Sequence, residues 1–173
     1  NVQVNTGIAA TSVSGDNGVI AVDAEELAQN VDLTIAGSSN VTVTNLEGDV
    51  RAGSQTGTLE VTTSGAADNG IEVTTSAGQT TINANAASDT ITTDASALAD
   101  NTILDLNGDS AFTVTNFKGD LEADGGAGAL SVTLADATDI KVDTARAGTV
   151  IADALSDDNT LQLAGSGDVT VTG

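Results

Sequence analysis

Carboxylates are the only ionisable side chains in this sequence numerous enough to support chemistry. The chain of 173 residues has 25 Asp and Glu against 4 Lys and Arg, and it contains no His and no Cys. Catalytic triads and zinc sites rely on His or Cys, so both classes of site are excluded. Paired carboxylates of the glycosidase kind remain open, but the chain lacks the Tyr and Trp that usually hold a sugar. We therefore expect no enzymatic activity.

Asp and Asn cluster in turn-like segments, and this pattern suits calcium, which prefers hard oxygen ligands. The candidate ligands are Asp16 and Asn17, Asp68 and Asn69, Asp157 and Asp158, and the pair Asp109 and Asp120. The competing interpretation is that Asp and Asn occupy turns because their side chains bond to the local backbone. For each single cluster, we favour the turn interpretation. We nevertheless expect at least one calcium ion somewhere in the protein from which the chain comes.

Thr residues form a second pattern with a chemical meaning. They recur in pairs that alternate with apolar residues: Thr42 and Thr44, Thr113 and Thr115, and Thr170 and Thr172. In a strand, both members of a pair would point outward, and flat Thr arrays occur on ice-binding solenoids. Thr is also a good strand former that keeps a surface soluble. Because the pairs recur once per unit and not on every coil, the solubility interpretation is favoured here.

Internal repeats organise these residues. The segment Val41–Val50 (VTVTNLEGDV) recurs as Phe112–Leu121 (FTVTNFKGDL). Ile35 corresponds to Leu106, and a third copy begins at Leu163, so the first unit is longer than the second. The longer unit contains an additional strand-like segment, 79–84. We predict one β-repeat array over 1–173, with units at about 20–90 and 91–147, partial units at 1–19 and 148–173, and repeats continuing beyond both ends.

The elements that carry these repeats are short strands. Apolar and polar residues alternate in segments such as 59–62, 71–74, 130–133 and 140–143, separated by turns rich in Gly, Asp and Asn. Segments around Leu27, Leu98 and Leu155 predict wider corners with room for one helical turn. Both units are much shorter than the roughly 100 residues of an immunoglobulin-like sandwich, and propeller blades usually carry aromatic markers. The predicted fold is an all-β, elongated parallel β-solenoid with two or three strands per coil.

Composition limits the core and the partners. Aromatic residues make up 1% of the chain, so the core must be thin and aliphatic. The net charge of −21 argues against nucleic acid and against anionic membrane surfaces. No apolar run approaches the length of a membrane span. The absence of Cys fits a large bacterial exported protein.

The repeat Val41–Val50 and its copy at Phe112–Leu121 resemble units of giant bacterial proteins of the hemolysin-type calcium-binding (RTX-like) class, which include adhesins and surface-layer proteins. The resemblance implies secretion in an unfolded state and folding outside the cell, often with calcium. The glycine-rich calcium nonapeptide of that class is not intact. Asp124–Leu130 has its glycines, but Ala129 stands where the class has Asp.

The sequence and the resemblance together predict a structural repeat scaffold, secreted to a bacterial surface as part of a surface layer, filament or matrix. Its expected partners are neighbouring repeats or identical subunits, with cell-surface glycans as a further candidate. One alternative is a calcium-rigidified stalk of a type I-secreted adhesin. Another is an ice-binding or polysaccharide-binding solenoid.

Overall fold

The computed structural model describes residues 1–65, 70–84, 86–87, 89–135 and 139–173, and these residues contain 18 β-strands and no helix. The strands, in chain order, are β1 (Val2–Asn5), β2 (Thr11–Gly15), β3 (Val19–Asp23), β4 (Asp32–Gly37), β5 (Asn40–Leu46), β6 (Asp49–Gln55), β7 (Leu59–Thr63), β8 (Ile71–Thr74), β9 (Thr80–Ala84), β10 (Thr90–Asp94), β11 (Ile103–Gly108), β12 (Ala111–Phe117), β13 (Asp120–Ala123), β14 (Leu130–Leu134), β15 (Ile140–Thr144), β16 (Gly148–Ile151), β17 (Leu161–Ala164) and β18 (Val169–Thr172). Within the same residues, no helix is long and apolar enough to cross a membrane.

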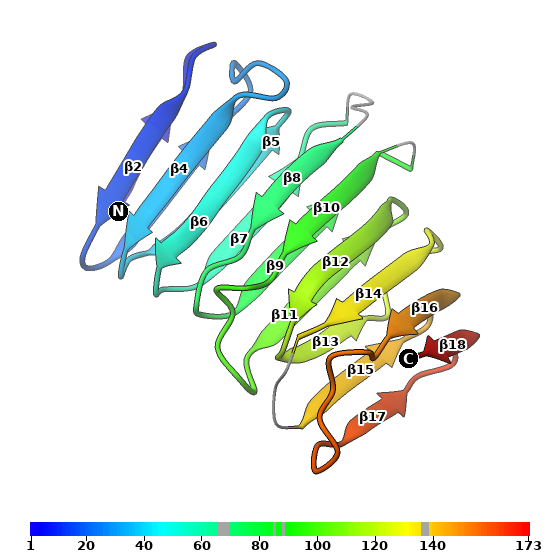
Figure 1. Cartoon of the computed structure of the whole chain (residues 1–173). Coiled ribbons are helices and arrows are strands. Elements are labelled where there is room, and N and C mark those ends of the chain that lie inside the picture. The colour runs from blue at the N-terminus through cyan, green and yellow to red at the C-terminus, as the bar shows by residue number, and fades with distance from the viewer. Residues whose placement is uncertain (66–69, 85, 88, 136–138) are drawn as a thin grey trace.

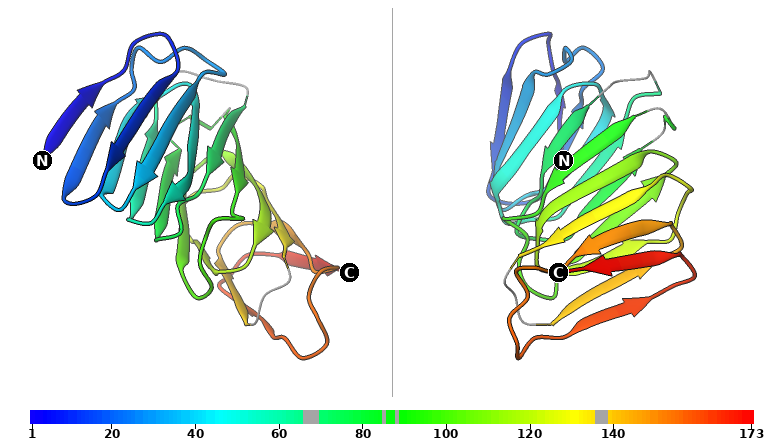
Figure 2. Two further views of the ribbon diagram at one scale, coloured as in Figure 1. Left: turned by 60° about the vertical axis from the view of Figure 1, so that its left-hand side comes forward. Right: turned by 45° about the vertical axis from the view of Figure 1, so that its right-hand side comes forward.

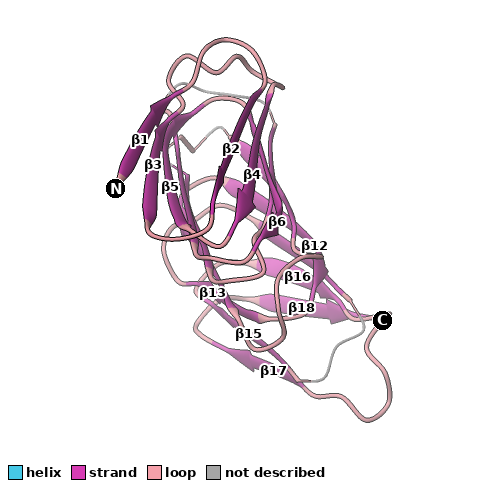
Figure 3. Ribbon diagram, turned by 90° about the vertical axis from the view of Figure 1, so that its left-hand side faces the viewer, coloured by secondary structure: helices cyan, strands magenta, loops and turns pink. Residues whose placement is uncertain are grey.

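The chain passes from one sheet to the other with every strand. Odd-numbered strands form one nine-stranded sheet, called here the odd sheet, and even-numbered strands form the other, the even sheet (Figures 1 and 3). All neighbouring strands within each sheet run parallel. The predicted parallel β-solenoid is therefore confirmed, with two strands per coil. The termini lie at opposite ends of the stack (Figure 2).

The alternation of apolar and polar residues fixes which side chains point inward. In β5, Val41 and Val43 are buried and Thr42 is only half-buried, and the same order recurs in the paired strands. Aliphatic residues of both sheets thus stack on their register partners between the layers. Phe112 and Phe117 are buried in this stack as well. Because each coil covers the apolar side of its neighbour, a chain with few aromatic residues still obtains a continuous core.

Wide corners occur where the sequence predicts them, but they contain turns and no helix. The N–H of Leu27 donates to the Ala24 carbonyl at 3.0 Å, and that of Leu98 donates to the Ala95 carbonyl at 3.1 Å. Leu27 and Leu98 are both buried. One turn is enough at each corner because its buried leucine covers the edge of the core.

The two sequence units differ by one strand, and this changes which sheet they occupy. The predicted additional segment forms β9, so β12 is the seventh strand after its copy β5, whereas β18 is the sixth strand after β12. Seven strands amount to three and a half coils. The motif at Val41 therefore lies in the odd sheet, and its copies at Phe112 and Val169 lie in the even sheet.

The local structure of the motif survives this change of sheet. Asn45 and Asn116 both adopt a left-handed backbone, with φ of 56° and 55°. At each asparagine, the register with the next strand shifts by a bulge. Asn45 donates to Asp23 at 3.1 Å and Asn116 donates to Asp94 at 3.0 Å. Half a turn of the solenoid thus reproduces the same environment.

Stacked turns approach each other too closely for side chains at two equivalent glycines. Gly37 and Gly108 have φ of 98° and 97°. A Cβ on Gly37 would overlap the carbonyl oxygen of Gly15, and one on Gly108 would overlap that of Ala84. Glycine is required at both positions by this contact between successive coils.

Candidate functional sites

The acidic turns predicted to bind calcium are distributed along the whole solenoid. Asp16 and Asn17 lie in the exposed turn between β2 and β3, where the Asp16 carbonyl accepts a hydrogen bond from the Ser38 hydroxyl. Asp157 and Asp158 are exposed in the wide corner before β17. Asp68 and Asn69 fall outside the described residues. The first and last of these clusters therefore belong to separate ends of the molecule.

The structure does not bring Asp109 and Asp120 together. Asp109 follows the end of β11, where it accepts a hydrogen bond from the Ala127 N–H at 3.0 Å. Asp120 opens β13 and pairs with Ile103 at the beginning of β11. The whole length of β11 separates them, which is about 20 Å. Their proximity in the repeat unit reflects sequence order, because the chain crosses to the even sheet and back between them.

No group of three or more carboxylates in the described residues could together hold a metal ion. The Asp109 side chain accepts its hydrogen bond from the backbone of the next coil and thus bonds to a neighbouring turn instead of its own. Calcium binding remains a prediction.

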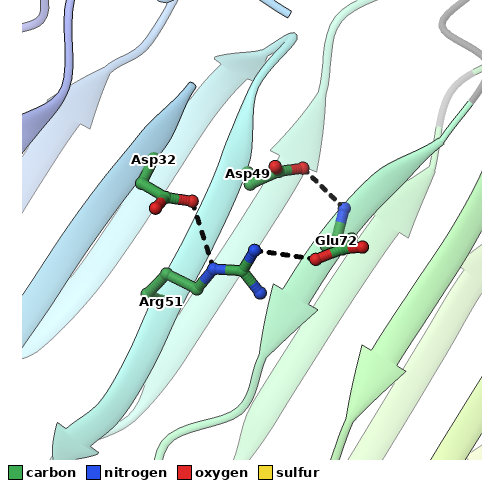
Figure 4. Close-up of polar contacts among 4 residues, drawn as sticks. All are labelled: Asp32, Asp49, Arg51 and Glu72. Carbon is green, nitrogen blue, oxygen red and sulfur yellow. Dashed lines mark hydrogen bonds and ion pairs between the residues drawn. The ribbon is translucent and has the colours of Figure 1, made fainter. Parts of the chain in front are cut away.

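Four of the charged side chains form a compact cluster on the outer surface of the even sheet (Figure 4). Arg51 lies between two carboxylates, with Nε 3.1 Å from Asp32 and Nη2 2.7 Å from Glu72. Asp49 accepts a hydrogen bond from the Glu72 N–H at 2.8 Å. Three successive strands of this sheet, β4, β6 and β8, supply these residues, so the cluster links three coils.

Burial and charge pull the pKa values in this cluster in opposite directions. Burial raises the pKa of Asp49, against the hydrogen bond from Glu72 and the attraction of Arg51. The hydrogen bond to Glu72 raises the pKa of Arg51. With Arg51 fixed as a cation between carboxylates, the cluster neutralises some of the acidic repulsion while it joins neighbouring coils.

Arg146 is the one fully buried side chain with a cationic group among the described residues. Its guanidinium donates to the carbonyls of Ser110 at 3.2 Å and Gly128 at 3.3 Å, and also to those of Gly108 and Gly125. It lies 5.0 Å from the centre of the Phe112 ring. Burial lowers the pKa of Arg146, partly offset by Asp109. This side chain ties the turns of three coils together and fills the corner between the sheets.

Outward positions of the odd sheet carry an acidic row in the C-terminal half. Asp105, Glu122 and Asp143 are register partners on β11, β13 and β15. Lys141, beside them, pairs with Asp143 at 3.1 Å, and this bond raises the pKa of Lys141. Like charges on adjacent strands repel one another, so this face favours bound cations or high salt.

The predicted Thr pairs separate between the two faces. Thr42 and Thr44 lie on the odd sheet, whereas Thr113, Thr115, Thr170 and Thr172 lie on the even sheet. Between β12 and β18, the even strands β14 and β16 add further hydroxyls in register. The Thr pairs themselves still do not recur on every coil, because β14 carries Ser131 and Thr133 and β16 carries Thr149 and Ile151. The sequence repeats do not reveal this row of hydroxyls, because each repeat unit is longer than one coil.

Comparison with known proteins identifies no relative: no family model, curated protein or solved structure matches the chain.

Sequence reasoning missed Arg146 and the Arg51 cluster for different reasons. Arg51, Glu72 and Asp32 come from three strands that pair only across successive coils, so the coil length had to be known to bring them together. A signal for Arg146 was present in the repeats. Residue 126 is Gly where the first copy has Gln55, so the second copy lacks a polar side chain that the first copy uses in its corner.

Proposed function

We propose that the chain is a structural repeat scaffold at a bacterial cell surface, in which coils add to coils to build a longer array. The observation that carries the proposal is the state of the two end coils. Val2 is 58% exposed, and Leu163 and Val171 are 43% and 45% exposed, although all three occupy inward register positions. A further coil stacked on either end would cover these side chains.

The outermost strands of both sheets carry no residue that would block the stacking of a further coil. β1, β2, β17 and β18 contain no charged residue and no Pro, although natural edge strands commonly carry charges or Pro to block pairing. Parallel stacking leaves open backbone donors and acceptors on both ends. Solenoids that remain monomeric usually close their ends with polar capping repeats.

Secretion and a surface location are supported by the sequence and not by the fold. The absence of Cys, the net charge of −21 and the resemblance to RTX-like repeats favour export. Calcium outside the cell would screen the acidic row at Asp105, Glu122 and Asp143 and so favour the folded, stacked state. The partner that covers each end is a coil of the same kind, from adjoining repeats or from an identical subunit.

Sedimentation velocity in calcium and in chelator, over a range of protein concentrations, tests the proposal. We expect species larger than the monomer to form with rising concentration, and calcium to increase them. The variant Leu163→Lys places a charge on the open apolar end and should abolish association. The matched control is Gln162→Lys, because Gln162 is the outward-facing neighbour on the same strand.

Association that is unchanged by Leu163→Lys would contradict end-to-end stacking. A chain that stays monomeric at all concentrations, with and without calcium, would favour the stalk alternative, in which separate domains perform binding.

A further inference from the structure

One outward row of the even sheet is hydroxylated on five consecutive strands. Each residue in the row is the register partner of the next, from β10 to β18. The row consists of Thr92, Thr113, Ser131, Thr149 and Thr170. Adjacent strands in a sheet lie about 4.8 Å apart, so the hydroxyls repeat at this interval. The five strands lie side by side along one side of the solenoid (Figure 1).

Short, stiff side chains flank this row on both sides. Two residues further along each strand, about 6.6 Å away, stand Asp94, Thr115, Thr133, Ile151 and Thr172. Before the row stand Ala111, Ala129, Ala147 and Asp168, which line a shallow depression with Thr113, Ser131 and Thr149. Side chains branched at Cβ have few rotamers. The side chains of the row therefore hold well-defined positions, and their hydroxyl groups repeat at a regular interval.

The hydroxyl row itself is uncharged on a strongly acidic protein, with Asp94 on β10 and Asp168 before β18 as the charged residues at its two ends. β12, β14, β16 and β18 contain no charged residue, whereas the chain has a net charge of −21. The odd strands of the same coils carry the acidic row of Asp105, Glu122 and Asp143. Among the strands β11 to β18, charged side chains thus lie only on the odd sheet. On the opposite side, the strands β12, β14, β16 and β18 present hydroxyl and methyl groups.

The hydroxyls of the row are available to an external partner. Within the part of the chain that the structure describes, those of Thr113, Ser131 and Thr149 make no hydrogen bond to protein. Their side chains are half-buried between neighbouring strands, which restricts their motion. Each hydroxyl can both donate and accept. A partner that meets them must present donors and acceptors at the same regular interval over several coils.

The face lacks what a sugar or protein partner would require. Sugar sites use aromatic platforms, and protein interfaces rely on Trp, Tyr and Arg anchors. The chain has no Trp or Tyr, and both Phe side chains are buried. Arg51 lies on the same sheet, but it is held in its own ion pairs. A row of regularly spaced hydroxyls without aromatic or arginine side chains suits a partner whose own groups repeat in a fixed lattice.

We infer that the face built by β10, β12, β14, β16 and β18 binds the surface of ice. Water molecules held by the hydroxyls and ordered around the methyl groups would continue into the water lattice of the crystal. Many weak, regularly spaced contacts then add up, and the uncharged hydroxyl row costs less to dehydrate than a row of charged side chains would. This inference is independent of the scaffold proposal, since it concerns the side of the solenoid and not its ends.

Thermal hysteresis of the purified chain, and partition of a fluorescently labelled sample into slowly growing ice, test the inference. We expect the wild type to enter ice and to slow its growth. Thr149→Lys, in the middle of the row, should abolish both effects. Thr81→Lys is the matched control, because Thr81 is a half-buried outward Thr on β9 of the odd sheet and should leave both effects intact.

Circular dichroism at the temperature of the assay verifies that both variants remain folded, and Thr149→Val provides a second test. It keeps the branched shape and removes one hydroxyl, so it should weaken ice partition less than Thr149→Lys does. Exclusion of the wild type from ice would overturn the inference. Equal loss in Thr149→Lys and Thr81→Lys would also overturn it. Retention of the wild type on cellulose or chitin powder, together with exclusion from ice, would replace ice with a polysaccharide surface.

Discussion

The two full copies of the repeat fill the same corner with different side chains. In the first copy, Gln55 donates to the carbonyl of Ser39 at 2.9 Å. In the second copy, the equivalent carbonyl is that of Ser110, and it accepts from Arg146, which lies two coils further along the chain. Gly126 stands where Gln55 would be. A Cβ there would overlap the carbonyl oxygen of the preceding coil and would lie 2.9 Å from Arg146.

This difference shows what the solenoid holds constant. The backbone geometry of the turn is preserved, including the left-handed Gly37 and Gly108. The side chain that satisfies the buried carbonyl is replaced by one from another coil. A buried acceptor needs a donor, but the fold does not specify which strand supplies it. The copies therefore share the same backbone geometry but can differ in their side chains. Because the second copy is offset by half a coil, it lies in the opposite sheet.

The largest expected effect comes from removing half a coil. Deletion of 76–85 removes β9 and leaves a connection from Thr75 to Thr90 as long as that from Thr144 to Thr149 in the second unit. Leu59 and Ile91 could then pair directly. Their separation in sequence would fall within the range that register partners already use, from the short coil between Leu33 and Val50 to the long one between Thr80 and Leu104.

We expect this deletion variant to fold and to transfer every strand from β10 onward to the opposite sheet. Spin labels at Glu60→Cys and Thr113→Cys measure the change. In the parent chain they lie on opposite faces, whereas in the variant they would share a face two strands apart, about 10 Å. An unchanged distance in a folded variant would show that the two half-coils are not interchangeable.

The corner side chains give the next largest effect. Arg146→Ala leaves four carbonyls without their donor and removes the packing on Phe112. We expect a loss of about 3 kcal/mol in the free energy of unfolding. Gln55→Ala removes the donor to Ser39 and Thr58 and should cost about 1–2 kcal/mol. Urea denaturation of both variants decides the order, and equal losses would contradict the comparison.

Much of this architecture could be predicted from sequence, because period-2 alternation and turn residues are local signals. The strands around Val41, Leu59, Ile71, Phe112, Leu130 and Ile140 follow them, and so does β9 as the additional segment of the longer unit. The side of the solenoid on which each side chain lies, and its neighbours there, could not be predicted in the same way. A side chain reaches its neighbour one coil later, and coil length varies with each turn. Asp109 and Asp120 were therefore expected together and lie apart, while Ser131 and Thr149 were overlooked and lie in one row.

The bulge asparagines should respond equally in the two copies. Asn45→Ala and Asn116→Ala each force Ala into a left-handed backbone and remove a hydrogen bond to an aspartate. We expect each variant to lose about 1–2 kcal/mol in the free energy of unfolding. Thermal or urea denaturation measures the losses. A large difference between the two variants would mean that the sheets place different demands on the motif.

The second of these variants also has a pH signature. Burial alone would raise the pKa of Asp94, but hydrogen bonds from Asn116 and Ser96 outweigh it and lower that pKa. A carboxylate with a lowered pKa in the folded state adds stability above its unfolded pKa, and this is lost as the pH falls through the folded value. The destabilisation by Asn116→Ala should therefore be largest near neutral pH and smaller in acid. A constant difference across this range would remove Asp94 from the explanation.

The smallest expected effect concerns the Arg51 cluster, which has no counterpart in the second copy because Glu122 stands at the position of Arg51. The Arg51 side chain is 41% exposed, so water screens its ion pairs. Arg51→Met should therefore change the free energy of unfolding by less than about 1 kcal/mol, as measured by urea denaturation in low salt. The change should shrink further at high salt, where ion pairs are screened. A loss that persists in high salt would mean that Arg51 acts by packing across β4, β6 and β8. The first copy would then depend on a contact for which the second copy has no equivalent.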